Sequence, residues 1–304
     1  MAFFLLASEP LPDGLRRIAR EETEKALSLL ESDQDLHFVV HETRKSMKKL
    51  RAIIRLVRDQ VGQNTYRSEN IRYRDLARRI SGLRDLGAIQ ETWTVLEGRT
   101  RSKVLNTLIQ KGKTEVQARL DAAAAAGNKE IATHISEAAV ILRSALAKLE
   151  TLDLGADRFK TIAPSLRRVY HRGYRGLKLA RRMPTTEYLH QWRKRVKYLL
   201  YQMEILQPSW PELMTPWALA LQQLSQLLGT DHDLAVLSET IEAGGLLNGR
   251  QQGKAQLLRL VDSYREELMA EILPLGHHLY ALPPKAFPKM IGKWYHTWRQ
   301  YPDT

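Results

Sequence analysis

Apolar residues recur at three- and four-residue spacing along almost the whole chain, which is the pattern of amphipathic helices. We find no convincing run in which β-branched and polar residues alternate between turn signals, as they do in a half-buried strand. The pattern therefore predicts an all-α fold. Helices are expected over residues 12–31, 35–61, 66–80, 85–97, 101–126, 129–150, 158–183, 186–206, 211–228, 231–243, 250–270 and 286–300.

Glycine and proline punctuate this pattern, and Thr185 or Thr186 can cap the helix that follows Pro184. No long Gly/Ser/Pro stretch divides the chain, so we expect one unit over residues 8–300 with closely packed halves at 8–153 and 156–300. The expected helix stops are Gly62, Gly98, Gly127-Asn128, Gly155, Pro184, Pro208 and Gly244-Gly245.

A histidine-led basic pattern occurs twice. The first copy reads His41-x-x-Arg44-Lys45-x-x-Lys48-Lys49-x-Arg51, and the second reads His190-x-x-Arg193-Lys194-Arg195-x-Lys197, at an offset of 190 − 41 = 149 residues. Segment 80–86 also aligns with segment 228–234 at an offset of 148 residues. Similarity in both order and spacing indicates an internal duplication.

Each copy becomes a cationic face when it is wound at about 100° per residue. The opposite faces are apolar, as Met47 and Leu50 show in the first copy and Trp192 and Val196 in the second. A third helix has the same design and contains no acidic residue between positions 167 and 182. The three cationic faces contain His41, Arg44, Lys45, Lys48, Arg51 and Arg55; His190, Arg193, Lys194 and Lys197; and Arg168, Arg172 and Arg175.

The scarcity of acidic residues distinguishes these faces from ordinary solvated ones. Glu42 is the only acid between His41 and Arg58. On a typical exposed helix, opposite charges four residues apart stabilise by about 0.2–0.5 kcal/mol, and like charges cost a similar amount. We therefore expect an external anion to balance the repulsion.

The formal net charge of +13 is consistent with a nucleic acid, a polyphosphate or an acidic membrane surface as partner. The chain has no cysteine, which excludes disulfides, thiolate metal sites and cysteine nucleophiles. No HExxH-like spacing, carboxylate cluster or phosphate-cradling glycine loop accompanies the basic faces, so we expect neither a metal, a cofactor nor an enzyme. No apolar run approaches the ~18 residues of a membrane span, and a soluble cytoplasmic protein without a membrane partner is expected.

With these paired motifs the chain resembles the CHAD family, the conserved histidine α-helical domain, over nearly its whole length. The resemblance implies two pseudo-symmetric four-helix-bundle halves around a basic central cavity that binds inorganic polyphosphate. The chain departs from the family pattern in three places. Leu200 occupies the final basic position of the second motif, and His232-Asp233 replaces its Arg-Asp pair. In the first half, Ser81-Gly82 replaces the leucine-glycine turn that the second half keeps as Leu228-Gly229. The residues to which the resemblance points are His41, Arg44, Lys45, Lys48, Arg51, His190, Arg193, Lys194 and Lys197.

The sequence thus predicts a non-catalytic polyphosphate-binding protein, to which Arg168, Arg172 and Arg175 add charge, and association with polyphosphate granules would follow. One alternative is a nucleic-acid backbone binder, which is less expected because the 7% aromatic residues are not interleaved with the basic faces. The other is a scaffold for an acidic protein. Direct ligand contact by the motif histidines stays open. Asp85 and Asp233 either orient basic side chains or cap the helices that follow.

Overall fold

The structure is a computed structural model that describes residues 2–81, 84–249 and 252–301, excluding the side chains of 84–85 and 123–130. Within these ranges every regular element is a helix, which confirms the all-α prediction. The α-helices are α1 (Leu11–Leu30), α2 (Leu36–Leu56), α3 (Arg58–Arg79), α4 (Arg84–Glu97), α5 (Lys103–Leu149), α6 (Ala163–Arg182), α7 (Thr186–Leu206), α8 (Pro211–Glu242), α9 (Lys254–Leu279) and α10 (Phe287–Gln300). Two short 3₁₀ helices are η1 (Phe159–Thr161) and η2 (Gln207–Ser209).

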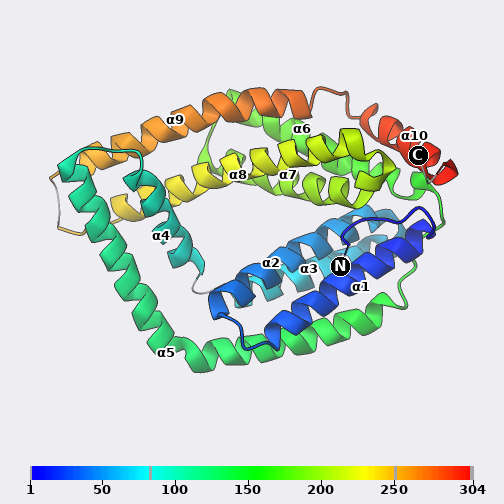
Figure 1. The fold of residues 1–304 in the computed structure, drawn as a ribbon, viewed down its shortest axis with the longest axis horizontal. Coiled ribbons are helices and arrows are strands. Elements are labelled where there is room, and N and C mark those ends of the chain that lie inside the picture. The colour runs from blue at the N-terminus through cyan, green and yellow to red at the C-terminus, as the bar shows by residue number, and fades with distance from the viewer. Residues whose placement is uncertain (1, 82–83, 250–251, 302–304) are drawn as a thin grey trace.

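Helices that are close in sequence also lie together in space. Helix α2 packs against α1 and α3, and α7 packs against α6 and α8, which in turn contacts α9. Figure 1 shows α5 starting near the beginning of α9, bending sharply and then running beneath α1, with α4 between α5 and α8. Helices α2 and α7, which carry the two basic motifs, pack directly against each other.

Two of the expected helix breaks are wrong. Residues 101–126 and 129–150 were expected as two helices but form the single helix α5, and α8 likewise joins 211–228 to 231–243. Glycine costs a helix interior only about 1 kcal/mol relative to alanine, and at the buried Gly229 of α8 tertiary packing outweighs that cost. Gly62 does interrupt helical structure as predicted, because its φ of 78° lies in the left-handed region. The helix predicted over 35–61 is wrong in its extent, since α2 ends at Leu56 and α3 begins at Arg58.

Both motif helices begin at a side-chain cap. The Asp35 carboxylate accepts a hydrogen bond from the Phe38 N–H at 3.0 Å at the start of α2. The Thr185 hydroxyl accepts one from the Tyr188 N–H at 3.3 Å at the start of α7, so Thr185 is the cap and Thr186 is not. Each cap satisfies a backbone donor that the first helical turn leaves unpaired.

The apolar sides of the two motif helices anchor them in the core. Met47 and Leu50 of α2 are buried, as are Trp192 and Val196 of α7. Trp192 occupies space left by two glycines: a Cβ at Gly176 of α6 or at Gly276 of α9 would lie 2.6 Å from its indole ring. This close packing fixes the rotation of α7 about its axis and leaves its cationic side facing away from the core.

A buried hydrogen bond also ties α2 to α7. The Gln202 side-chain amide of α7 donates to the Ala52 carbonyl of α2 at 3.2 Å, and both residues are wholly buried. The chain near the N-terminus adds a backbone bond, from the Leu5 N–H to the Ile205 carbonyl at 3.0 Å. The two basic faces are therefore held in a fixed relation.

Candidate anion-binding site

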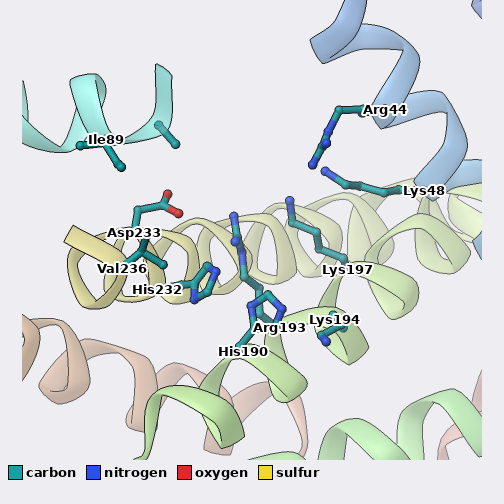
Figure 2. A pocket seen from close by; sticks show the side chains of 11 residues that line it. Arg44, Lys48, Ile89, His190, Arg193, Lys194, Lys197, His232, Asp233 and Val236 are labelled. Carbon is teal, nitrogen blue, oxygen red and sulfur yellow. The ribbon is translucent and has the colours of Figure 1, made fainter. Parts of the chain in front are cut away.

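A cavity of about 420 Å³ lies where α2, α4, α7 and α8 meet (Figure 2). We call it the basic cavity, because five permanently cationic side chains line it against a single carboxylate. Its lining consists of Arg44 and Lys48 from α2, Ala88 and Ile89 from α4, His190, Arg193, Lys194 and Lys197 from α7, and His232, Asp233 and Val236 from α8. Six of the residues predicted from the sequence are thus brought together.

Helical spacing explains how one face of each helix supplies these side chains. Arg44 and Lys48 are four residues apart, and His190, Arg193, Lys194 and Lys197 follow the three- and four-residue spacing of one face. Figure 2 shows Arg44 and Lys48 pointing from α2 toward the side chain of Lys197 on α7. Donors from two helices therefore converge on one space.

Two of the arginines are positioned by backbone that lies close to them. The Arg44 Nη1 donates to the Ala77 carbonyl near the end of α3 at 3.1 Å. Arg193 lies against Gly229 of α8, where an added Cβ would be 2.8 Å from the guanidinium Nη2. Gly229, which was expected beside a helix break, instead lets the Arg193 guanidinium lie against an unbroken helix.

The electrostatics of the cavity wall show an excess of positive charge. Burial lowers the pKa of Lys194 below its usual value, and Arg195, Arg51 and Arg78 lower it further. Like charges destabilise one another's charged form. An anion placed among them would reverse this effect.

Two histidine rings lie close together in the wall, tilted relative to each other. The rings of His190 and His232 have centroids 4.2 Å apart and an interplanar angle of 35°. Burial lowers the pKa of His190 to about 4, with further lowering by His232, Lys194 and Arg193. Burial and Arg193 also lower the pKa of His232. Both rings are consequently neutral at physiological pH.

Of the two aspartates noted in the sequence, Asp233 lies in the wall of the cavity (Figure 2). It sits inside α8, so it does not cap a helix. The side chain of Asp85 lies outside the described residues. Sequence reasoning missed Asp231, which is buried and accepts a hydrogen bond from Arg265 Nε at 2.9 Å, linking α8 to α9.

Four residues of the first motif do not line the cavity, namely His41, Lys45, Lys49 and Arg51. His41 is exposed, with its Nε2 4.0 Å from Glu42 Oε1, and the Nζ of Lys45 is 3.5 Å from the same oxygen. Glu42 also pairs with Lys25 of α1 at 3.0 Å. Only part of the cationic face of α2 is directed toward α7. His41 and Lys45, at the outer edge of that face, lie near Glu42 instead.

A second group of cationic residues, which we call the arginine cluster, surrounds a hollow of about 10 Å³ between α2, α3, α6 and α7. Arg168 pairs with Asp59 at 3.1 Å, and no ion pair to a carboxylate is found for the other four arginines within the described ranges. Sequence reasoning missed Arg58 and Arg195, although both lie in runs poor in acid. The arginine cluster consists of Arg55, Arg58, Arg168, Arg172 and Arg195, with Tyr66 and Tyr198 beside them.

Arg55 is the most buried cation of this cluster. Its guanidinium donates to Asn70 Oδ1 at 2.6 Å and lies 3.9 Å from the centre of the Tyr198 ring. Burial lowers the pKa of Arg55 to about 10, which still leaves it charged at neutral pH. Arg51 donates to the same Asn70 oxygen at 3.1 Å. Arg175 is exposed and lines neither the basic cavity nor the arginine cluster.

Neither a metal-ligand cluster nor a membrane-spanning helix is found in the described part of the chain. No three histidine or carboxylate side chains there are grouped as metal ligands would be. None of the helices in those ranges combines the length and apolar character that crossing a membrane requires.

A family model described as CHAD domain matches residues 13–242 of the 304. The chain belongs to the CHAD domain family. The part of this CHAD domain that the family model matches includes α2, α4, α7 and α8, the four helices that line the basic cavity, whereas α9 and α10 follow it. No curated protein matches the chain.

Proposed function

We propose that this CHAD domain binds inorganic polyphosphate in the basic cavity without catalysing a reaction. The observation that carries the proposal is the convergence of Arg44 and Lys48 with Arg193, Lys194 and Lys197 around one space that contains one carboxylate. The CHAD family is itself associated with polyphosphate binding. Cytoplasmic polyphosphate, including that in granules, is the partner we infer.

The chemistry of the lining suits a chain of phosphates. Arginine offers planar, two-donor contacts to phosphate oxygens, and lysine offers a mobile point charge. A linear polyphosphate carries about one negative charge per phosphate along a flexible chain, so it needs many donors at short spacing and little shape complementarity. A cavity of about 420 Å³ admits such a chain.

The arginine cluster extends this path for longer chains. Arg195 and Arg51 are among the charges that lower the pKa of Lys194, and the same two arginines lower that of Arg55. Positive charge is therefore continuous from the cavity to Arg172 and Arg168, beside Arg55. We place His41, Lys45 and Arg175 at the outer edges of this path.

The arrangement of helices supports the pseudo-symmetry that we include in the proposal. The order α1–α2–α3 is followed by α6–α7–α8, and within each group the motif helix packs against both neighbours. Two related halves would place one basic motif on each side of the ligand. The scarcity of carboxylates in the cavity, where Asp233 is the one described, argues for binding rather than phosphoryl transfer, which uses carboxylate-held metal ions.

Reversing two charges of the basic cavity tests the proposal. Arg44→Glu with Arg193→Glu removes one donor from each helix, and hydrogen bonds to charged groups contribute about 1.5–3 kcal/mol each. We expect affinity for long-chain polyphosphate, measured by calorimetry, to fall roughly 100-fold or more, with the helical circular-dichroism signal unchanged.

The matched control is Lys285→Glu with Lys289→Glu. Both lysines are exposed near α10, away from the cavity, and their reversal changes the net charge by the same amount. We expect this variant to lose little affinity. An equal loss in both variants would mean that net charge, rather than the basic cavity, governs binding.

A further inference from the structure

The two adjacent histidines, His190 and His232, leave polar atoms unused at the wall of the basic cavity. The Nδ1 atoms of His190 and His232 are both buried and have no hydrogen-bond partner among the described residues. A buried imidazole nitrogen without a partner is unusual, since such groups nearly always find one. Both residues line the cavity, so a ligand there is close to both rings.

The closeness of the rings limits how much charge they can hold. With centroids 4.2 Å apart, two imidazolium cations would repel strongly, so the pair accepts one proton far more readily than two. A pair of this kind titrates as one unit. It therefore behaves as a single proton-binding site within the wall.

The surroundings of the pair are cationic on most sides. Helix α2 contributes Arg44 and Lys48, helix α7 contributes Arg193 and Lys194, and the described lining residues of α4 are the apolar Ala88 and Ile89. Acidic groups face His232 from its own helix, where they are Asp231, Asp233 and Glu239. Asp231 is itself paired with Arg265 of α9. Without a bound anion, the net positive charge around the pair disfavours its protonation. A bound anion would reverse this effect.

We propose that the His190–His232 pair takes up one proton when a polyanion occupies the basic cavity, so that binding is tighter in mildly acidic solution. This inference rests on the proposed function of the cavity. It assigns His232, which stands where the family pattern has the arginine of its Arg-Asp pair, as part of the site together with its histidine partner. The pair then gains one positive charge, and its unpartnered ring nitrogens gain an anion nearby as a hydrogen-bond acceptor.

The direction of the pH effect follows from linkage. In the free protein the pKa of His190 is about 4, below the value of about 6.5 for an unperturbed histidine. Bound phosphate oxygens favour the charged form and raise the pKa of the pair. Between the free and the bound values, binding takes up a proton, so affinity rises as the pH falls through this window.

Calorimetry of long-chain polyphosphate binding measures this proton directly. At about pH 5.5 the titration is repeated in two buffers of different ionisation enthalpy, and the difference gives the number of protons taken up per bound site. The native chain is compared with His190→Gln/His232→Gln, and with His277→Gln/His278→Gln, which alters two exposed neighbouring histidines of α9. The phosphate polymer titrates equally in all three, so differences belong to the protein.

On binding, native protein and the α9 control should each gain as much as one proton more per site than the His190→Gln/His232→Gln variant. As the pH falls below about 6.5, their affinity should rise more steeply than that of the variant, by up to about tenfold more for each pH unit. The same uptake in all three proteins would overturn the proposal while leaving polyphosphate binding intact. Absence of binding by native protein at every pH would instead overturn the proposed function.

Two further measurements guard against a variant that does not fold. In the native chain, the imidazole proton resonances of His190 and His232 should titrate at higher pH when polyphosphate is saturating, and an unchanged titration would reject the proposal. His232→Arg places a permanent cation in the wall. We expect this variant to bind more tightly than native protein at about pH 7.5 and to show a weaker pH dependence.

Discussion

The Arg193 guanidinium can lie against α8 because the residue it contacts there, Gly229, has no side chain. Gly229 lies inside α8, where its backbone is helical and alanine would normally be favoured by about 0.5–1 kcal/mol. An alanine Cβ would nevertheless lie 2.8 Å from Arg193 Nη2. The flexible end of the arginine yields more readily than the helix, so the guanidinium moves and the backbone stays.

Gly229→Ala should therefore separate stability from binding. We expect the melting temperature to be unchanged or slightly higher, and affinity for polyphosphate to fall roughly tenfold through the displaced charge-assisted contacts. Thermal unfolding and calorimetry check the two effects. Gln226→Ala, at an exposed position of the same helix, is the control and should alter neither. Unchanged affinity in Gly229→Ala would remove Arg193 from the contact.

At this scale the sequence predicts which residues are cationic and on which side of a helix they lie. A helical projection of α2 places His41 and Lys45 on the same face as Arg44 and Lys48. It does not reveal which of these residues face α7. Lys45 forms an ion pair with Glu42, an acid within the same motif. The large excess of basic residues makes this pairing hard to predict from the sequence. His232 joins the cavity only because α8 passes beside α7, and that proximity has no local signal.

Among the elements, α9 has an importance that the family match does not convey. It follows the matched region, yet it packs along α8 and buries Leu257, Val261, Leu268 and Ile272. Each buried aliphatic side chain contributes about 1.5–3 kcal/mol, whereas a whole domain is stable by only about 5–15 kcal/mol. Losing α9 would also expose Trp192, which packs on Gly276.

A chain that ends after Glu242 should consequently fail to fold. We expect its circular-dichroism spectrum to lose the cooperative thermal transition of the full chain, and its amide protons to exchange freely. A chain that ends after Gln300 keeps all of α9 and α10 and serves as the comparison. A cooperative transition in the shorter chain would show that α1 to α8 form a self-sufficient core.

The helices themselves are predictable because their apolar periodicity is strong, and the two caps at Asp35 and Thr185 are readable as N-terminal signals. The continuity of α5 and α8 could not be predicted. The sequence shows the free-energy cost of a glycine inside a helix, but it does not show the interactions that offset this cost. The crossing of α2 and α7 depends on a buried contact between Gln202 and Ala52, 150 residues apart.

For the whole molecule, the net charge of +13 attracts any polyanion at low salt, so shape must provide selectivity. Nucleic acids bind basic proteins through counterion release, which weakens steeply as salt increases. A duplex is too wide to enter a cavity of about 420 Å³ and would contact only its rim. A slender phosphate chain inside the cavity is shielded from the surrounding salt.

Competition at several salt concentrations distinguishes the two partners. Labelled long-chain polyphosphate is challenged with duplex DNA, single-stranded RNA and triphosphate. We expect polyphosphate to remain bound at about 0.15 M salt, where the Debye length is about 8 Å, while the nucleic acids compete only at lower salt. Equal displacement by nucleic acid at physiological salt would favour a general polyanion binder.

The close packing of Trp192 between Gly176 and Gly276 also constrains how the molecule can diverge. The three positions lie on three different helices, and neither glycine tolerates a larger side chain unless the indole at position 192 becomes smaller. Residues 176, 192 and 276 should therefore change together during evolution, whereas Arg193, one residue away, can drift to other cations. Adjacent positions in the chain would then evolve under separate rules, one of volume and one of charge.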